Sequence, residues 1–379
     1  MKDVSKKISF LVFFVLLIIL PLATVVLPKD KFSETENRYL EEYPELSAEN
    51  VFSREYMKDI ETYLSDHFVE RTGWIAAKTD IELLLGKHES NGVFILKDRL
   101  AEKLDSPDYN EIDKSINAIN NFAKDNKIPT YVMITPTATG IYREELPKNA
   151  PQYDQKKFID DVYEKLSPDV TSLDAYSPLF SNRDDYIYYR NDHHWTTLGA
   201  YYAYASTIKK MGFAPIPLEN FDIEHASNTF KGTLYSKSLY NKIDADTLDL
   251  YHYDGGVNVT EVDINNGKSE KKYDSMYFKE FLDKKDKYST FFGSNQPIVT
   301  VKTDAPKDTK LLIFKDSYAH CYVPFLAQHY SEITMIDLRY MNEAYSKAIN
   351  VNDYDQVLFL YNGATFATES NIKKLDIKE

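Results

Sequence analysis

Cysteine and glycine are both scarce in this 379-residue chain. Its single cysteine, Cys321, cannot form an intramolecular disulfide, and it rules out a zinc site built from several cysteines. We interpret Cys321 as a small packing residue, because free cysteine is usually buried. The 12 glycines form neither a Walker loop nor a Gly-x-Gly-x-x-Gly motif. We therefore expect no cofactor and no metal ion.

Positive charge is also in deficit. The chain has 45 lysines and arginines against 59 aspartates and glutamates, for a formal net charge of −14. Phosphate-backbone binding needs a basic surface, so this balance argues against a nucleic-acid partner. It also disfavours broad electrostatic adhesion to anionic lipid.

One segment near the N-terminus lacks charge altogether. The 20 residues from Ile8 to Leu27 carry none, and Lys2, Lys6 and Lys7 precede them. That length suits a hydrocarbon core of about 30 Å, and the preceding lysines place the N-terminus inside the cell. We predict that residues 1–29 are an uncleaved membrane anchor, with a cleaved signal peptide as the alternative. The remaining chain is then extracytoplasmic on a single-pass cell-membrane protein, or secreted if cleavage occurs, as in a bacterial envelope.

The remaining chain alternates helical and strand patterns. Such alternation predicts an α/β fold in which helices flank a parallel sheet. The expected helices are 52–68, 75–85, 109–126, 156–166, 197–211 and 318–330, and the expected strands are 93–96, 130–135, 170–174, 311–314, 333–338 and 356–362.

The alternation is interrupted at about residues 213–308. This region contains turn signals, Asp254-Gly255-Gly256 and Asn265-Asn266-Gly267, between runs rich in tyrosine and valine. Turn signals between such runs are typical of β-hairpins. We predict a β-rich insertion rather than a separate domain.

The run NDHHW at residues 191–195 has the clearest chemical content. Thr196 or Thr197 is a good N-cap for the following helix, so the preceding residues are expected to be extended. In an extended segment the side chains of Asp192 and His194 lie on the same side, and that of His193 points elsewhere. A carboxylate beside an imidazole is how hydrolases orient a general base.

Ser317 is the candidate nucleophile. It lies where the expected strand LLIF, after Lys315 and Asp316, gives way to a helix. In open α/β sheets ligands bind at this edge, and a helix N-terminus supplies N–H groups to an oxyanion. The alternative interpretation is that Ser317 is an ordinary helix cap, and that the two histidines are structural.

Other polar residues are expected at the same edge. Arg339 and Tyr340 follow the strand ITMIDL, and Tyr361 and Asn362 end the strand QVLFLYN. An arginine and a tyrosine there are suited to hold sugar hydroxyls, a uronate or an oxyanion. The alternative is that strand ends are simply polar.

Six segments resemble, in order, those of the DHHW protein family, a bacterial group related to the SGNH-hydrolase-like alginate O-acetyltransferase proteins. They are FSETENRYLEEYP (32–44), YLSDHFVERTGW (63–74), NGVFILKDRL (91–100), VMITPTATGIYREELP (132–147), NDHHW (191–195) and FKDSYAHCYVPFL (314–326). The resemblance spans nearly all of the chain after the N-terminus. NDHHW together with the serine block is its specific part.

The resemblance implies that residues 30–379 form one SGNH-hydrolase-like extracytoplasmic domain. It assigns a catalytic triad to Asp192, His194 and Ser317, in an order permuted relative to ordinary SGNH esterases. Lys315 departs from the family pattern, because glycine usually precedes Asp-Ser there. Related O-acetyltransferases use an arginine and a tyrosine after the serine, which favours Arg339 and Tyr361 as substrate-binding residues. Trp195, in the same motif as His194, is the third candidate.

Three functions are consistent with these features. The first is a serine-dependent O-acetyltransferase or O-acetylesterase acting on a cell-envelope or secreted polysaccharide, with a membrane-bound O-acyltransferase partner if the acetyl donor lies inside the cell. The second is a non-catalytic polysaccharide-binding or scaffold protein that retains the fold, which the departure at Lys315 suggests. The third is a metal-dependent phosphoesterase using Asp192, His193 and His194, although the eight histidines lack further ligand spacing.

Overall fold

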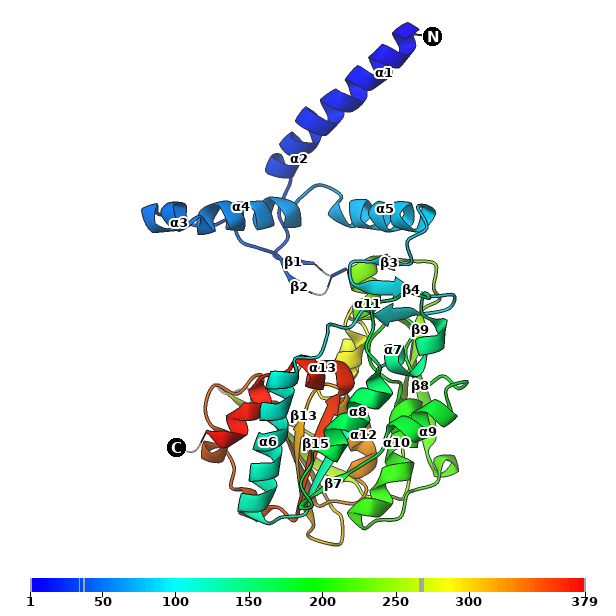
Figure 1. Cartoon of the computed structure of the whole chain (residues 1–379), viewed down its shortest axis with the longest axis vertical. Coiled ribbons are helices and arrows are strands. Elements are labelled where there is room, and N and C mark those ends of the chain that lie inside the picture. Colours follow the sequence, from blue (N-terminus) through cyan, green and yellow to red (C-terminus); the bar gives the residue numbers. More distant parts are fainter. Residues whose placement is uncertain (1, 34, 37, 266–268, 378–379) are drawn as a thin grey trace. The chain divides into compact units, whose positions relative to one another are not determined.

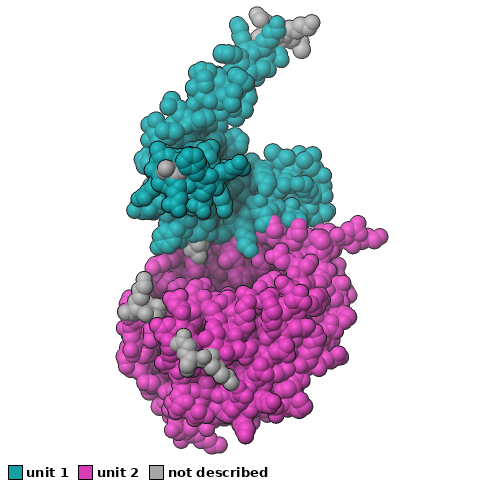
Figure 2. Space-filling view, turned by 60° about the vertical axis from the view of Figure 1, so that its left-hand side comes forward, with its two compact units in different colours: residues 1–91, 235–242 teal, residues 92–234, 243–379 magenta. Residues whose placement is uncertain are grey.

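The computed structural model describes residues 2–33, 35–36, 38–265 and 269–377. It divides into two compact units. Unit 1 comprises Met1–Asn91 and Tyr235–Lys242, and unit 2 comprises Gly92–Leu234 and Ile243–Glu379 (Figure 2). An apolar helix that ends at Val26 lies within unit 1.

Unit 1 begins with that helix. Its α1 (Lys2–Phe14), a π-helical turn (Val15–Ile19) and α2 (Leu20–Val26) follow one another without a break (Figure 1). The 23 residues from Val4 to Val26 include an 18-residue stretch with a mean hydropathy of 2.9, and the helix is long enough to cross a membrane. The remaining elements are β1 (Phe32–Ser33), β2 (Arg38–Tyr39), α3 (Ala48–Ser53), α4 (Glu55–Asp66), α5 (Arg71–Leu84) and β3 (Glu89–Ser90).

Two ion pairs hold the short strands of unit 1 against its helices. Arg38 donates to both carboxylate oxygens of Asp66, and Arg71 donates to Glu36. The hydrogen bonds from Arg38 lower the pKa of the Asp66 carboxyl. Asp66 also accepts the backbone N–H of Glu41 at 2.9 Å. These contacts lie within the segments 32–44 and 63–74 and join them in space.

Unit 2 is built on an eight-stranded sheet with the order β11-β10-β12-β14-β13-β15-β6-β7. The five strands from β14 to β7 are parallel, while β12, β10 and β11 are antiparallel. The sheet strands are β6 (Thr130–Thr135), β7 (Val170–Ser172), β10 (Val259–Asn265), β11 (Glu270–Tyr273), β12 (Ile298–Thr303), β13 (Lys310–Lys315), β14 (Glu332–Ile336) and β15 (Gln356–Asn362).

Helices cover both faces of this sheet, as the alternation predicts. One face packs against α6 (Tyr109–Asn126), α8 (Gln155–Glu164) and α13 (Gly363–Thr368), and the other packs against α10 (Thr197–Thr207) and α12 (Ala319–Leu326) (Figure 1). Successive residues of β13 alternate between the two cores, because side chains along a strand point to opposite faces. The smaller elements of unit 2 are β4 (Val93–Ile95), β5 (Leu100–Glu102), α7 (Ala138–Ile141), α9 (Tyr176–Ser181), β8 (Asp222–Phe230) and β9 (Asp246–His252). Helix α11 (Thr233–Ser238) begins in unit 2, and its residues from Tyr235 on belong to unit 1.

The region predicted as a β-rich insertion does contain most of the antiparallel strands. Strands β8 and β9 form a hairpin, whereas β10, β11 and β12 extend the main sheet. The turn expected at Asn265-Asn266-Gly267 includes residues 266 and 267, which lie outside the described residues. The alternation of α/β units stops here because antiparallel strands need no helical crossover.

Helix boundaries follow the expected caps at α10. The Thr196 hydroxyl accepts the N–H of Gly199 at 3.2 Å, and Gly212 has a φ of +92° just after the final 3₁₀ turn. The helix after Ser317 is shorter than expected. It ends at Leu326 rather than Tyr330, and Pro324 lies within it. Because proline cannot donate a backbone hydrogen bond, it weakens the last turns.

Candidate active site

Ser317 lies in the tight turn between β13 and α12, at the carboxyl edge of the parallel strands. The fully buried Asp316 holds this turn together. One of its carboxylate oxygens accepts the N–H of Tyr318 at 2.9 Å, and the other accepts the backbone and side-chain N–H groups of Asn362, both at 2.7 Å. Asn362 ends β15, so Asp316 ties two neighbouring strands together directly beneath the serine.

The structure brings Asp192, His194 and Ser317 together across more than a hundred residues of sequence. His194 Nε2 lies 2.7 Å from Ser317 Oγ, and His194 Nδ1 lies 2.5 Å from Asp192 Oδ1. A carboxylate can only accept, so Nδ1 carries the proton and Nε2 is left to accept the serine hydroxyl. This is the geometry of a nucleophile, a general base and an orienting carboxylate.

The backbone around Asp192 differs from the expected extended segment. Residues 190–194 form a series of bends, in which Asp192 Oδ1 also accepts the N–H of His194 at 3.0 Å. The turn brings the two side chains together, as the expected i, i+2 spacing would. His193 does not point away from them, since its ring centroid lies 3.8 Å from that of His194.

The second oxygen of Asp192 is held by the 213–308 region. It accepts the N–H of Thr233 at 2.8 Å and the Thr233 hydroxyl at 3.0 Å. His193 Nδ1 lies 2.6 Å from the same hydroxyl oxygen. Because the Thr233 hydroxyl already donates its proton to Asp192, its oxygen accepts a hydrogen bond from His193 Nδ1. A Cβ on Gly232 would lie 2.1–2.5 Å from atoms of Asp192. Only glycine allows the backbone to approach the carboxylate this closely.

Tyr288, from a 3₁₀ turn (Lys287–Thr290) of the same region, contacts both His194 and Ser317. Its ring stacks on the His194 imidazole at 3.7 Å between centroids and 8° between planes. Its hydroxyl donates to the carbonyl oxygen of Ser317 at 2.9 Å. One buried side chain therefore sets both the plane of the imidazole and the position of the serine backbone.

Burial controls the protonation states of the pair. Desolvation lowers the pKa of His194 to about 4, helped by the neighbouring His193 and opposed by Asp192. The pKa of Asp192 is well below its usual range, because the two imidazoles and the hydrogen bonds outweigh its own burial. At neutral pH His194 is thus neutral and Asp192 is ionised, as a general base and its orienting group require.

Lys315, the departure from the family pattern, points away from the serine into a buried polar network. Its Nζ donates to His320 Nε2 at 2.6 Å and lies 3.6 Å from Asp337. Burial lowers the pKa of Lys315 to about 8, against the attraction of Asp337. Burial and the charge of Lys315 together lower the pKa of His320, which therefore accepts in its neutral form. The lysine is accommodated without displacing Ser317.

Arg339 also belongs to this network, because it contacts Asp337. Its guanidinium makes two hydrogen bonds to Asp337, at 2.8 and 2.7 Å, and its side chain is 27% exposed. It lies at the end of β14, beside the strand that leads to Ser317. Of the three predicted substrate-binding residues, it alone is accessible.

The other two are buried. Trp195 is fully enclosed, donates from Nε1 to the carbonyl of Tyr318 at 3.0 Å and stacks on Tyr322. It supports the serine turn from below, and its ring is not available to a substrate. Tyr361 is 2% exposed and packs with the core on the sheet face opposite His194, where its hydroxyl has no partner among the described residues. Two-residue periodicity along β15 places it there.

One cluster of side chains has the ligand atoms that a metal site would need. Ligand atoms of Asp192, His193 and His194 lie within 4.8 Å of one another. Each of these residues is already hydrogen bonded within the protein: Asp192 to His194 and Thr233, His193 to Thr233, and His194 to Ser317. These hydrogen bonds use both oxygens of Asp192, Nδ1 of His193 and both ring nitrogens of His194.

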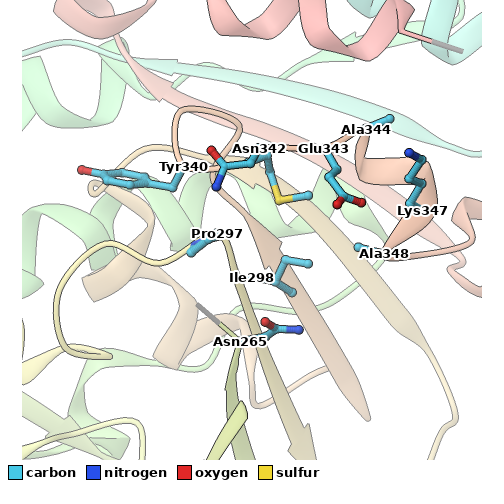
Figure 3. Close-up of a pocket in the computed structure, with 10 residues that line it drawn as sticks. Asn265, Pro297, Ile298, Tyr340, Asn342, Glu343, Ala344, Lys347 and Ala348 are labelled. Carbon is cyan, nitrogen blue, oxygen red and sulfur yellow. The ribbon is translucent and has the colours of Figure 1, made fainter. Parts of the chain in front are cut away.

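A pocket of about 310 Å³ is lined mainly by the segment after β14 that begins at Tyr340, the residue that follows Arg339 in the chain (Figure 3). Tyr340, Asn342 and Glu343 line it together with Pro297 and Ile298 of the neighbouring strand. Its size is at the lower limit for ligand pockets.

Sequence reasoning missed the residues that support the site: Thr233, Gly232, Tyr288 and the network of Lys315, His320 and Asp337. None carries a motif of its own. The turn at Lys231-Gly232-Thr233 and the tyrosine at 288 become informative only when the chain brings them to Asp192 and His194.

The sheet and the covering helices define an α/β protein in which Asp192, His194 and Ser317 are hydrogen bonded to one another at the carboxyl edge of the parallel strands. The chain belongs to the DHHW protein family, whose model matches residues 86–336. A DHHW family protein from Eubacterium siraeum is 26% identical, with a TM-score of 0.66 over 76% of this chain and 95% of that one. No curated protein matches this chain.

Two further structures are similar. Bacillus cereus PatB1, solved with a sulfonyl adduct, is 22% identical, with a TM-score of 0.65 over 76% of this chain and 100% of that one. The O-acetyltransferase domain of Pseudomonas putida AlgJ is 14% identical, with a TM-score of 0.46 over 73% of this chain and 93% of that one. The likeness to PatB1 supports the fold described above.

Proposed function

We propose that this protein is an extracytoplasmic serine-dependent O-acetyltransferase or O-acetylesterase acting on a cell-envelope or secreted polysaccharide. The observation that carries the proposal is the 2.7 Å contact between His194 Nε2 and Ser317 Oγ, with Asp192 on the other ring nitrogen. A neutral imidazole aligned in this way can take the serine proton as the oxygen attacks an acyl carbonyl.

The first half-reaction acylates the serine. Ser317 Oγ forms a bond to the carbonyl carbon while its proton passes to His194 Nε2, and Asp192 stabilises the resulting imidazolium. As the tetrahedral intermediate collapses, the bond from the acyl carbon to the donor oxygen breaks. His194 returns the proton to that oxygen, which leaves as an alcohol.

The second half-reaction releases the acyl group. His194 takes a proton from a sugar hydroxyl or from water, whose oxygen attacks the acyl-serine ester, and returns a proton to Ser317 Oγ as the ester bond breaks. A sugar acceptor gives transfer and water gives hydrolysis. Transfer therefore requires that the acyl-serine be kept from water. If the acetyl donor lies inside the cell, a membrane-bound O-acyltransferase partner supplies the acyl group across the membrane.

Ser317→Ala tests the catalytic assignment. The wild-type protein is expected to be labelled by a sulfonyl fluoride or fluorophosphonate probe, and the variant is expected to lose that labelling. Ser289→Ala is the matched control, because Ser289 is a buried serine that hydrogen bonds Asp286 and does not contact His194. Labelling that persists in Ser317→Ala contradicts the assignment.

A non-catalytic scaffold is the alternative function. Binding of glycan by a protein that neither reacts with the probes nor turns over acyl esters would favour it.

We also propose that Arg339 contacts the glycan. Its side chain is 27% exposed while its nitrogens bind Asp337, and Tyr340, the next residue in the chain, lines the pocket in Figure 3. Arg339→Gln is then expected to raise KM for a glycan acceptor by about tenfold, the loss of one charged hydrogen bond. Hydrolysis of a small acyl ester, which needs no glycan contact, serves as the control. An equal loss in both reactions would show that Arg339 acts only by holding Asp337.

A further inference from the structure

Exposed apolar side chains are concentrated in unit 1. After the apolar N-terminal helix, residues 39–85 contain eleven large hydrophobic side chains that are exposed. Among the described residues of unit 2, only four are exposed: Tyr109, Phe180, Tyr340 and Ile377. Large apolar patches on a soluble surface are uncommon and mark a contact with something else.

The exposed apolar residues of α5 and of its C-cap, Leu85, form one stripe. At 100° per residue, the side chains of Trp74, Ala77, Ile81, Leu84 and Leu85 fall within an arc of about 100°. Trp74 is 48% exposed and Leu84 is 86% exposed. The opposite side of α5 carries the buried Thr79, which bonds Ser90 and the carbonyl of Ser238. The helix is therefore held by one face and leaves a second apolar face uncovered.

The approach to α5 contacts the end of the apolar helix. The N–H of Val69, two residues before α5, donates to the hydroxyl of Thr24 at 3.2 Å, and Thr24 is 4% exposed. Thr24 lies in the last turn of the 23-residue span, which extends about 35 Å at 1.5 Å per residue. If that span crosses a core of about 30 Å, α5 begins at the membrane surface.

We propose that the stripe on α5, with Met57 and Leu64 of α4, lies in the interface of a lipid bilayer. Continuity with the apolar helix points to lipid as the occupant, and a tryptophan suits the interface because its ring is amphipathic. Residues 48–85 contain eight acidic and four basic side chains, so burial of apolar area drives this contact. Addition of anionic lipid is not expected to strengthen it.

The two tryptophans allow a direct test on the full chain. Trp195 is fully buried in unit 2, whereas Trp74 lies on the stripe. In phosphatidylcholine vesicles whose acyl chains are brominated near the headgroup, we expect tryptophan emission to fall by roughly a third to a half, all from Trp74. Trp74→Phe should abolish the quenching, since it leaves only Trp195. Unquenched emission in the wild-type protein would overturn the proposal.

A second measurement separates lipid from a protein partner. Cys321 is buried, so a nitroxide on Ile81→Cys or, as the matched control, on Asp80→Cys labels one chosen position. Both side chains are exposed and adjacent, but only Ile81 lies on the stripe. In nanodiscs holding one copy of the chain, the label at 81 should be more accessible to oxygen than to a polar relaxant, and the label at 80 should show the reverse. If the apolar environment at 81 appears only when several copies share a membrane, a second copy covers the stripe and the lipid proposal is wrong.

Discussion

At the scale of single residues, the hydrogen-bond partners of the two ring nitrogens determine the tautomer of His194. Nδ1 faces an ionised carboxylate and Nε2 faces a serine hydroxyl, so the tautomer follows from the partners. Stacking on Tyr288 removes water from one face of the ring. Because a buried imidazolium is costly, the resting base is neutral over the whole physiological range.

This protonation state predicts the pH dependence of the reaction. Activity needs neutral His194, which predominates above its pKa of about 4. We expect kcat/KM for a small acyl ester to rise through about pH 4 and then to stay level up to about pH 7. The pH profile of kcat/KM, with circular dichroism at each pH to confirm folding, tests this. An acid limb near 6.5, the ordinary histidine value, would mean that the imidazole is solvated in the free enzyme.

At the scale of elements, the antiparallel region contributes as much to the site as the parallel strands. The β13–α12 turn presents Ser317, but the segment after β8 holds Asp192 through Thr233, and the turn before β12 supplies Tyr288. Strand-end geometry explains why the nucleophile lies at the carboxyl edge. It does not explain the carboxylate, whose position depends on close approach of the backbone at Gly232.

Gly232→Ala tests that close approach. The added Cβ would overlap the Asp192 carboxylate, so Asp192 or the Thr233 segment must move. We expect kcat/KM to fall by about 10²-fold, as for a catalytic group displaced by roughly 1 Å. Gly73→Ala in α5 is the matched control, because a Cβ there meets nothing within 4 Å. Activity of Gly232→Ala equal to that of the control would show that the Asp192 carboxylate is not held this tightly.

At the scale of the whole molecule, the apolar N-terminal helix supports the proposal that the chemistry occurs outside the cell. Lys2, Lys6 and Lys7 precede the span, and positive flanks stay in the cytoplasm.

Cysteine labelling in intact cells tests this topology. Asp184→Cys places a thiol on an exposed position of unit 2, and Ser5→Cys places one before the span, while Cys321 is buried. We expect a membrane-impermeant maleimide to label position 184 in intact cells and position 5 only after lysis. Labelling of both positions only after lysis would place unit 2 in the cytoplasm, and the envelope substrate would then be wrong.

The sequence alone was sufficient to predict the apolar N-terminal helix, the α/β layers and the meeting of Asp192, His194 and Ser317. These features depend on local signals: an uncharged run, strand and helix periodicities, and two motifs with distinct chemistry. The parallel strand ends were enough to place Ser317 and Arg339 at one edge. Only the tertiary structure decided that Trp195 and Tyr361 are buried, that Lys315 points away from the serine, and that Thr233 and Tyr288 hold the triad. Those outcomes depend on which face of a strand or turn meets its neighbour, and packing between distant segments determines that face.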